Sequence, residues 1–150
     1  MDLQRQEETR RLVQDLLRSQ RFAVLSTQSD AGPYSSLIAF WAAENLDHVI
    51  FATMRDSRKF RHLATRPAVA LLFDDRSNRD VDIDQATAVT ATGTADEVDG
   101  ESARAASAGF LAKHPQLASF VASPGCALVR VDVDTYYVVT HFQNVVQLRV

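Results

Sequence analysis

The chain has 150 residues, of which 46% are hydrophobic and 23% charged, as in a globular protein with a hydrophobic core. Its net charge of −3 excludes a general positive field for holding nucleic acid. The single cysteine, Cys126, excludes an internal disulfide and a multi-cysteine metal site, and it suits a reducing compartment. The polar opening "MDLQRQEETRR" is unlike a signal peptide, and no apolar run reaches the roughly 18 residues that span a bilayer, so we expect a cytoplasmic protein.

The first half of the chain predicts one helix and then a series of strands. Residues 4–20 place Leu12, Val13, Leu16 and Leu17 on one face of a helix. The segments that follow are β-prone and are separated by turn signals such as "QSDAGP" and "ENLD". They predict strands at 22–27, 34–43, 48–53 and 68–74. The continuous apolar character of the last segment, "AVALLFD", indicates a buried strand.

The second half continues with strands on either side of a helical region. It predicts a strand at 86–98, a helical region at 101–122 broken by Pro115, and two or three strands in 126–150. Short turns between strands favour antiparallel pairing. About six strands with peripheral helices predict a mainly β (α+β) fold, a closed or nearly closed barrel that forms a single domain over residues 1–150.

The segment "TMRDSRKFRHL" (53–63) concentrates positive charge at the start of a short helix that runs from about Ser57 to Thr65. Its four basic residues are Arg55, Arg58, Lys59 and Arg61. Cations at a helix N-terminus are disfavoured by about 0.3–1 kcal/mol, so their position needs a reason. A bound phosphate would supply one, because Arg58 and Lys59 would neutralise it while Ser57 and Thr53 add hydroxyl donors. The alternative is a solvated basic face that contacts a nearby carboxylate, namely Asp56, Asp74 or Asp75.

An ordered set of segments carries a family resemblance. The set is "FAVLSTQSDAGPYSSLIAFW", then "HVIFATMRDSRKFRHLATRPAVALLFDDRSN", then "ATAVTATGTADEV", which together cover roughly residues 20–98. It resembles the pyridoxamine 5'-phosphate oxidase-like FMN-binding split β-barrels. Its most specific part is "AT" followed by "SRKFRHL" and "RPAVALLF". The resemblance implies a six-stranded antiparallel split β-barrel with peripheral helices.

The resemblance also implies a cofactor site. Arg58 and Lys59 would hold the FMN phosphate, assisted by Ser57 and Thr53. The strand that contains Ser35, Ser36 and Leu37 would run beside the flavin ring, with a serine hydroxyl addressing its polar edge, and Ala52 would lie on the neighbouring strand. Arg76, Ser77 and Asn78 of the "DDRSN" segment would approach the flavin or a substrate, or the segment is simply a hairpin turn.

Departures from the vitamin B6 oxidase pattern make pyridoxine phosphate oxidation an unexpected activity. Ser35 and Phe40 stand where those enzymes have a basic residue and a lysine, and the C-terminal segment "THFQNVVQLRV" shows no tryptophan with a basic pair. The glycines form no dinucleotide fingerprint, and the histidines have no metal-ligand spacing. His62 is expected on the outer face of the short helix. His141 is either a proton donor or axial ligand near a cofactor, or a packed or solvent-facing residue.

The sequence therefore predicts an FMN-binding flavoprotein, an oxidoreductase of unknown substrate with no metal. Within the same fold the alternatives are a protein that binds deazaflavin (F420) or haem. From another class, the chain is a non-catalytic flavin-binding module or an interaction domain with an empty site. The resemblance implies a homodimer with the cofactor at the subunit interface, closed over by side chains such as Trp41 or His141. Apolar residues on both faces of several strands support such a partner surface.

Overall fold

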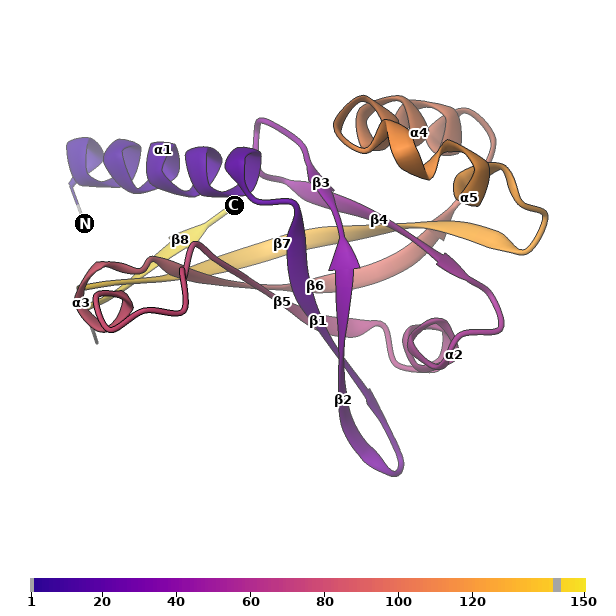
Figure 1. Cartoon of the computed structure of the whole chain (residues 1–150), viewed down its shortest axis with the longest axis horizontal. Helices are drawn as coiled ribbons and strands as arrows, with labels where there is room; N and C mark the ends of the chain where they lie inside the picture. The colour runs from indigo at the N-terminus through magenta and orange to yellow at the C-terminus, as the bar shows by residue number, and fades with distance from the viewer. Residues whose placement is uncertain (1, 142–143) are drawn as a thin grey trace.

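The computed structural model describes residues 2–141 and 144–150, and its fold is a curled antiparallel sheet flanked by helices (Figure 1). The helices are α1 (Leu3–Ser19), α2 (Arg58–Thr65), α3 (Asp82–Gln85), α4 (Gly100–Lys113) and α5 (Ala118–Ala122), with a 3-10 turn at Pro115–Leu117. The strands are β1 (Phe22–Ser29), β2 (Gly32–Ala39), β3 (Trp41–Ala42), β4 (His48–Met54), β5 (Ala68–Asp74), β6 (Ala88–Val98), β7 (Cys126–Thr140) and β8 (Asn144–Arg149).

The described strands form one sheet in the order β2-β1-β5-β6-β7-β4-β3, and β8 pairs with β7 beyond the end of β4. The expected six strands are too few. Eight are present in the described residues, and seven of these have at least six residues. Part of the difference arises because the segment 34–43 is broken at Phe40 into β2 and β3.

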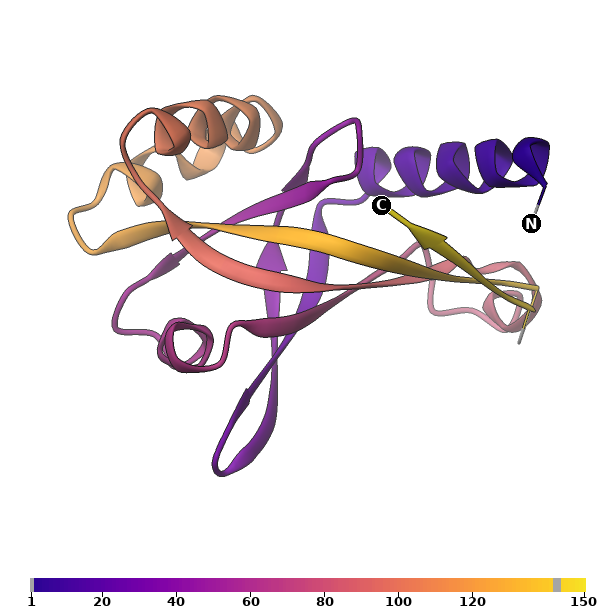
Figure 2. The ribbon, with the colours of Figure 1, turned by 180° about the vertical axis from the view of Figure 1, so that it is seen from behind.

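The sheet curls because the strands at its two ends, β2 and β3, are consecutive in the chain. β2 pairs with β1, whereas β3, only one residue further on, pairs with β4. The long strands β6 and β7 run side by side along the back of the sheet (Figure 2). Their register shifts at Gly93, where a Cβ atom would lie 2.2 Å from the Asp132 carbonyl oxygen, so only glycine permits this approach. This arrangement matches the expected split barrel.

The inner face of the sheet and one face of α1 form the main core. Val13, Leu16 and Leu17 of α1 pack there with Phe51 and Phe73 from β4 and β5. α4 and α5 cover a second, outer cluster around Ile50, Phe110 and Leu128. The apolar face of α1, with Val13, Leu16 and Leu17, is the one that the sequence predicts.

β5 differs from its expected burial. Its seven residues alternate, so that Val69, Leu71 and Phe73 are buried and their neighbours remain at least partly accessible. The apolar run had indicated a strand covered on both faces, but no described helix covers the outer face of β5. The accessible residues Ala70 and Leu72 therefore belong to an open apolar wall.

The helices follow the predicted bounds closely. α2 begins after Ser57 and ends at Thr65, and the helical region after residue 100 is interrupted at Pro115. The short helix α3 has no predicted counterpart, because a single turn leaves no hydrophobic periodicity in the sequence. No described helix is long and apolar enough to cross a membrane.

Candidate functional site

The N-terminus of α2 is built from a strand end and a helix cap. Ser57 is the N-cap, and its hydroxyl accepts a hydrogen bond from the Phe60 N–H at 3.3 Å. The Thr53 hydroxyl, at the end of β4, lies 2.8 Å from the Ser57 hydroxyl. Since the first N–H groups of a helix lack intrahelical partners, this corner gathers hydroxyls and N–H donors at the positive end of the helix dipole.

The four basic residues of this segment have different partners. Arg55 forms a forked ion pair with Glu97, with 2.7 Å between Nη2 and Oε2. Arg61 donates to the Asp56 carbonyl oxygen at 2.6 Å. None of the ion pairs within residues 2–141 and 144–150 includes Arg58 or Lys59. The expected alternative, a basic face contacting nearby carboxylates, therefore has no such contact at these two positions.

A groove of about 420 Å³ opens beside this corner, and we refer to it as the α2 groove. Its walls come from β2, β4, α2, α4, the 3-10 turn and α5. The lining residues are Leu37, Ile38, Ala39, Ala52, Thr53, Met54, Ser57, Lys59, Phe110, Leu117 and Phe120. Lys59 is the only charged side chain in this lining, so the groove is apolar along its length and cationic where it meets α2.

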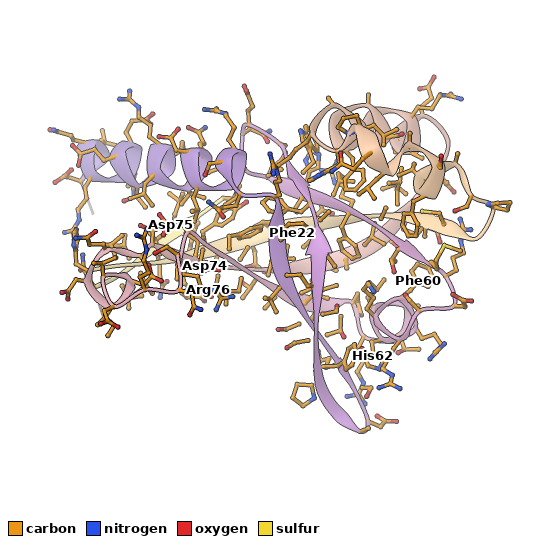
Figure 3. The ribbon with its side chains drawn as sticks, in the orientation of Figure 1. Phe22, Phe60, His62, Asp74, Asp75 and Arg76 are labelled. Carbon is orange, nitrogen blue, oxygen red and sulfur yellow. The ribbon has the colours of Figure 1, made fainter. Side chains whose placement is uncertain are left out.

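Arg58 lies outside the groove lining, over the ring of Tyr34. Its guanidinium carbon is 5.3 Å from the ring centroid. The Tyr34 ring in turn meets His62 edge to face, and His62 Nδ1 lies 3.0 Å from the buried Thr27 hydroxyl. His62 was expected on the outer face of α2, but it is half-buried against β1 and β2, and Figure 3 shows it beside this hairpin. The stack fixes Arg58 next to the helix N-terminus.

The serines of β2 take opposite sides of the strand. Ser35 is exposed, and its hydroxyl lies 3.5 Å from that of Ser26 on β1. The Ser36 hydroxyl is buried without a hydrogen-bond partner among the described residues, so it offers no surface to a ligand in this conformation. Leu37 and Ala52 face the α2 groove instead. The structure thus brings together Leu37, Ala52 and the α2 corner, whereas the two serines lie beside the groove rather than in it.

Asn78 lies far from this corner. It follows β5, whose first residue is near α2 and whose last, Asp74, is at the opposite end; Figure 3 shows Asp74 and Arg76 well away from His62. Asn78 has φ of 62°, a left-handed conformation, and the Asp82 carboxylate caps the loop by accepting from the Ser77 and Arg79 N–H groups. These bonds lower the pKa of Asp82 to about 2.

His141 also lies away from the α2 groove. Cys126 at the start of β7 pairs with Met54 beside α2, so His141, one residue beyond the other end of this 15-residue strand, is remote within one chain. It is exposed and has φ of 47°. Residues 142 and 143, next in the segment, lie outside the described residues.

Sequence reasoning missed the aromatic side of the groove. Phe110 and Phe120 come from α4 and α5, more than forty residues after the end of α2 in the chain. Helical apolar residues normally indicate a core, and only the packing of α4 on the outer face of β4 shows that they also form a groove wall. The partly exposed Phe120, with 38% of its surface accessible, carries no distinguishing signal in the sequence.

Comparison with models of known protein families identifies the family that has this architecture. A family profile described as pyridoxamine 5'-phosphate oxidase matches residues 9–140. The chain belongs to this family. No curated protein matches it. The resemblance that the sequence carried is thereby confirmed, and it extends beyond residues 20–98 on both sides.

Several solved structures share the fold at low sequence identity. A haem-binding protein from Mycobacterium smegmatis superposes with a TM-score of 0.81 at 16% identity, over 91% of this chain and 55% of that one. The General Stress Protein 26 from Bacillus anthracis gives 0.70 at 19% identity, over 95% and 99%. A FAD-binding protein from Mesorhizobium loti gives 0.66 at 13% identity, over 83% and 88%. This chain thus spans little more than half the length of the haem-binding protein, and the similar structures include one described as haem-binding and one described as FAD-binding.

Proposed function

We propose that this protein binds FMN in the α2 groove and is a flavin-dependent oxidoreductase. One observation carries the proposal. Two cations without a carboxylate partner among the described residues, Arg58 and Lys59, stand at a helix N-terminus that ends an apolar groove. A flavin mononucleotide has the matching shape, with an apolar ring at one end and one phosphate at the other.

The residues present fit that ligand. Lys59 and Arg58 would hold the phosphate by charge-assisted hydrogen bonds, and the hydroxyls of Ser57 and Thr53 would add donors. The side chains of Ala39 and Ala52 are small, so a flat ring can approach the backbone closely at these positions. The flavin, when bound, supplies the redox chemistry, and the protein holds and orients it. FMN is favoured over FAD because the described residues of the site offer one compact anion corner and no second phosphate loop.

Haem is the principal alternative, because one similar structure is a haem-binding protein. Haem iron needs an axial ligand such as histidine, cysteine or methionine. Among the described residues that line the α2 groove, none is a histidine or cysteine, and Met54 is the one thioether. Met54 is therefore the one described lining residue that could ligate haem iron, whereas Lys59 and Arg58 at the N-terminus of α2 match a phosphate group, so we favour a flavin.

Identification of the released chromophore tests the cofactor. The protein is purified, or reconstituted with a mixture of FMN and FAD, its visible spectrum is recorded, and the chromophore is released with acid and separated by chromatography. We expect FMN in a one-to-one ratio with the chain. Release of FAD, haem or F420 would contradict the assignment.

We also propose a homodimer with the cofactor at its interface, in the cytoplasm. The outer face of β1, β2 and β5 carries apolar cross-strand pairs. Phe22 pairs with Ala39, and Val24 pairs with Leu37 on one side and Leu72 on the other. Leu37 is 68% exposed and Phe22 57%, and Leu37 also lines the α2 groove, so a partner covering this wall would reach the cofactor site (Figure 3). Light scattering at micromolar concentration should give twice the chain mass. A monomer that still binds flavin tightly would refute the interfacial site.

Turnover separates an enzyme from a flavin-binding module. The FMN-loaded protein is mixed with a reduced nicotinamide or reduced F420 and an electron acceptor, and donor oxidation is followed. Steady turnover above free FMN supports the oxidoreductase assignment. Tight binding without turnover supports the module.

A further inference from the structure

A second cleft lies between α1, the turn that joins β3 to β4, and the end of α4, and we call it the Lys113 cleft. Its volume is about 290 Å³, and it shares no lining residue with the α2 groove. Leu17 and Arg18 line it from α1, Trp41 and Leu46 from the β3–β4 region, and Lys113 from α4. Nothing in the flavin assignment gives this cleft a role.

The half-buried ammonium group of Lys113 is the chemical feature of this cleft. Its Nζ donates to the Leu17 carbonyl oxygen at 2.9 Å and lies 3.9 Å from the centroid of the Phe40 ring. A carbonyl oxygen and an aromatic face stabilise a cation only in part. No ion pair of the described residues includes Lys113, and burial lowers its pKa to about 8. The group thus lacks a counter-charge.

The other charges in the cleft favour a ligand with a single negative charge. Arg18 is already paired with Asp15 at 3.5 Å and Glu44 at 3.9 Å. Glu44 also lines the cleft, so a dianion such as a phosphate would meet a carboxylate as well as a lysine. A monoanion supplies the one missing charge.

The walls of the cleft suit an apolar body. The Trp41 indole packs directly on the backbone of α4 at Gly109, where a Cβ atom would lie 2.6 Å from the ring. Because glycine allows this contact, the indole packs against α4 and lines the cleft together with the small apolar side chains of Ala42, Ala43 and Ala112. Flat aromatic and small apolar surfaces bind apolar groups without requiring hydrogen bonds.

We propose that the Lys113 cleft is a second small-molecule site, which binds a small aromatic monocarboxylate with its carboxylate on Lys113 and its ring against Trp41. The ligand pairs the ammonium group and fills the apolar part of the cleft. Within one chain this site is separate from the α2 groove, since the two share no lining residue.

Benzoate is the probe, and Trp41, the only tryptophan in the sequence, is the reporter. The protein labelled with 15N is titrated, and the indole N–H cross-peak of Trp41 is followed by NMR. We expect a saturable shift. Benzamide, which has the same size and no charge, should bind roughly tenfold or more weakly. Equal binding of benzamide would overturn the assignment to Lys113, and this comparison needs no variant.

Two lysines in the whole chain provide a matched pair of variants. Lys113→Met should weaken benzoate by roughly tenfold or more, whereas Lys59→Met in the α2 groove should leave it unchanged. If Lys59→Met lost benzoate binding, or if Lys113→Met kept it, the probe would bind outside the Lys113 cleft and the proposal would be wrong. Failure to saturate in the wild type would likewise overturn the proposal.

The pH dependence gives a further readout. Benzoate requires the ammonium form, so its affinity should fall roughly tenfold for each pH unit above about 8. The other charged groups of the cleft are Arg18 and Glu44, which lie 3.9 Å from each other, and the neighbouring His114 is buried with Nε2 2.7 Å from the Phe40 carbonyl oxygen. An affinity that stays constant between pH 7 and roughly 10 would contradict a contact with Lys113.

Discussion

Replacing both Arg58 and Lys59 by alanine should weaken FMN binding strongly and leave the fold intact. Neither residue takes part in an ion pair of the described chain, so the truncation leaves no protein charge behind. Each charge-assisted contact to a phosphate is worth about 1.5–3 kcal/mol, so losing two removes at least about 3 kcal/mol. Since about 1.4 kcal/mol corresponds to tenfold, affinity should fall by roughly a hundredfold or more.

The stability terms nearly cancel. Arg58 loses its position over the Tyr34 ring, which at an exposed site is worth about 0.5–1 kcal/mol. Each cation removed from the first turn of α2 stabilises the folded state by about 0.3–1 kcal/mol, because it no longer opposes the helix dipole. The thermal unfolding midpoint of the apo protein should therefore change little.

Flavin fluorescence quenching measures the affinity, and circular dichroism follows unfolding. Arg61→Ala is the matched control, because Arg61 lies on the same helix but donates to the Asp56 carbonyl oxygen. FMN affinity in the control should be within a few-fold of the wild type. Unchanged affinity in the double variant, or an equal loss in Arg61→Ala, would refute the phosphate assignment and restore a solvated basic face.

Two further predictions concern stability. Tyr136→Phe should destabilise the protein by about 1–3 kcal/mol in chemical denaturation, because the buried Tyr136 hydroxyl donates to the Leu46 carbonyl oxygen at 2.7 Å and its loss leaves that oxygen unpaired; an unchanged midpoint would contradict this. The pKa of Asp82 is lowered in the folded state to about 2 from 3.8, so its contribution is present above pH 4 and is lost as the pH falls toward 2. Asp82→Asn should therefore lower the unfolding midpoint at neutral pH, with the difference from wild type vanishing near pH 2; a difference independent of pH would refute the capping role.

Local patterns in the sequence were sufficient to predict α1, α2 and most strands. Val13, Leu16 and Leu17 repeat with helical spacing, and Ser57 has both the chemistry and the position of an N-cap, so neighbouring residues alone decide these elements. The concentration of cations after Ser57 led us to predict an anion corner, because its sign conflicts with the helix dipole, and this stays a prediction. The ordered segments around it predicted the family, which the match over residues 9–140 confirms.

Tertiary packing decided what the short-range patterns leave open. The break at Phe40, which gives β2 and β3 different partners, depends on how the whole sheet curls and leaves no mark in the segment itself. The exposed outer face of β5 depends on whether a helix covers it, so the same apolar run fits both outcomes. Phe110 reaches the α2 groove, and Lys113 meets Leu17 across 96 residues, only because α4 folds back over β4 and α1. Contacts between residues so distant in sequence arise from the packing of complete elements, and no local propensity encodes them.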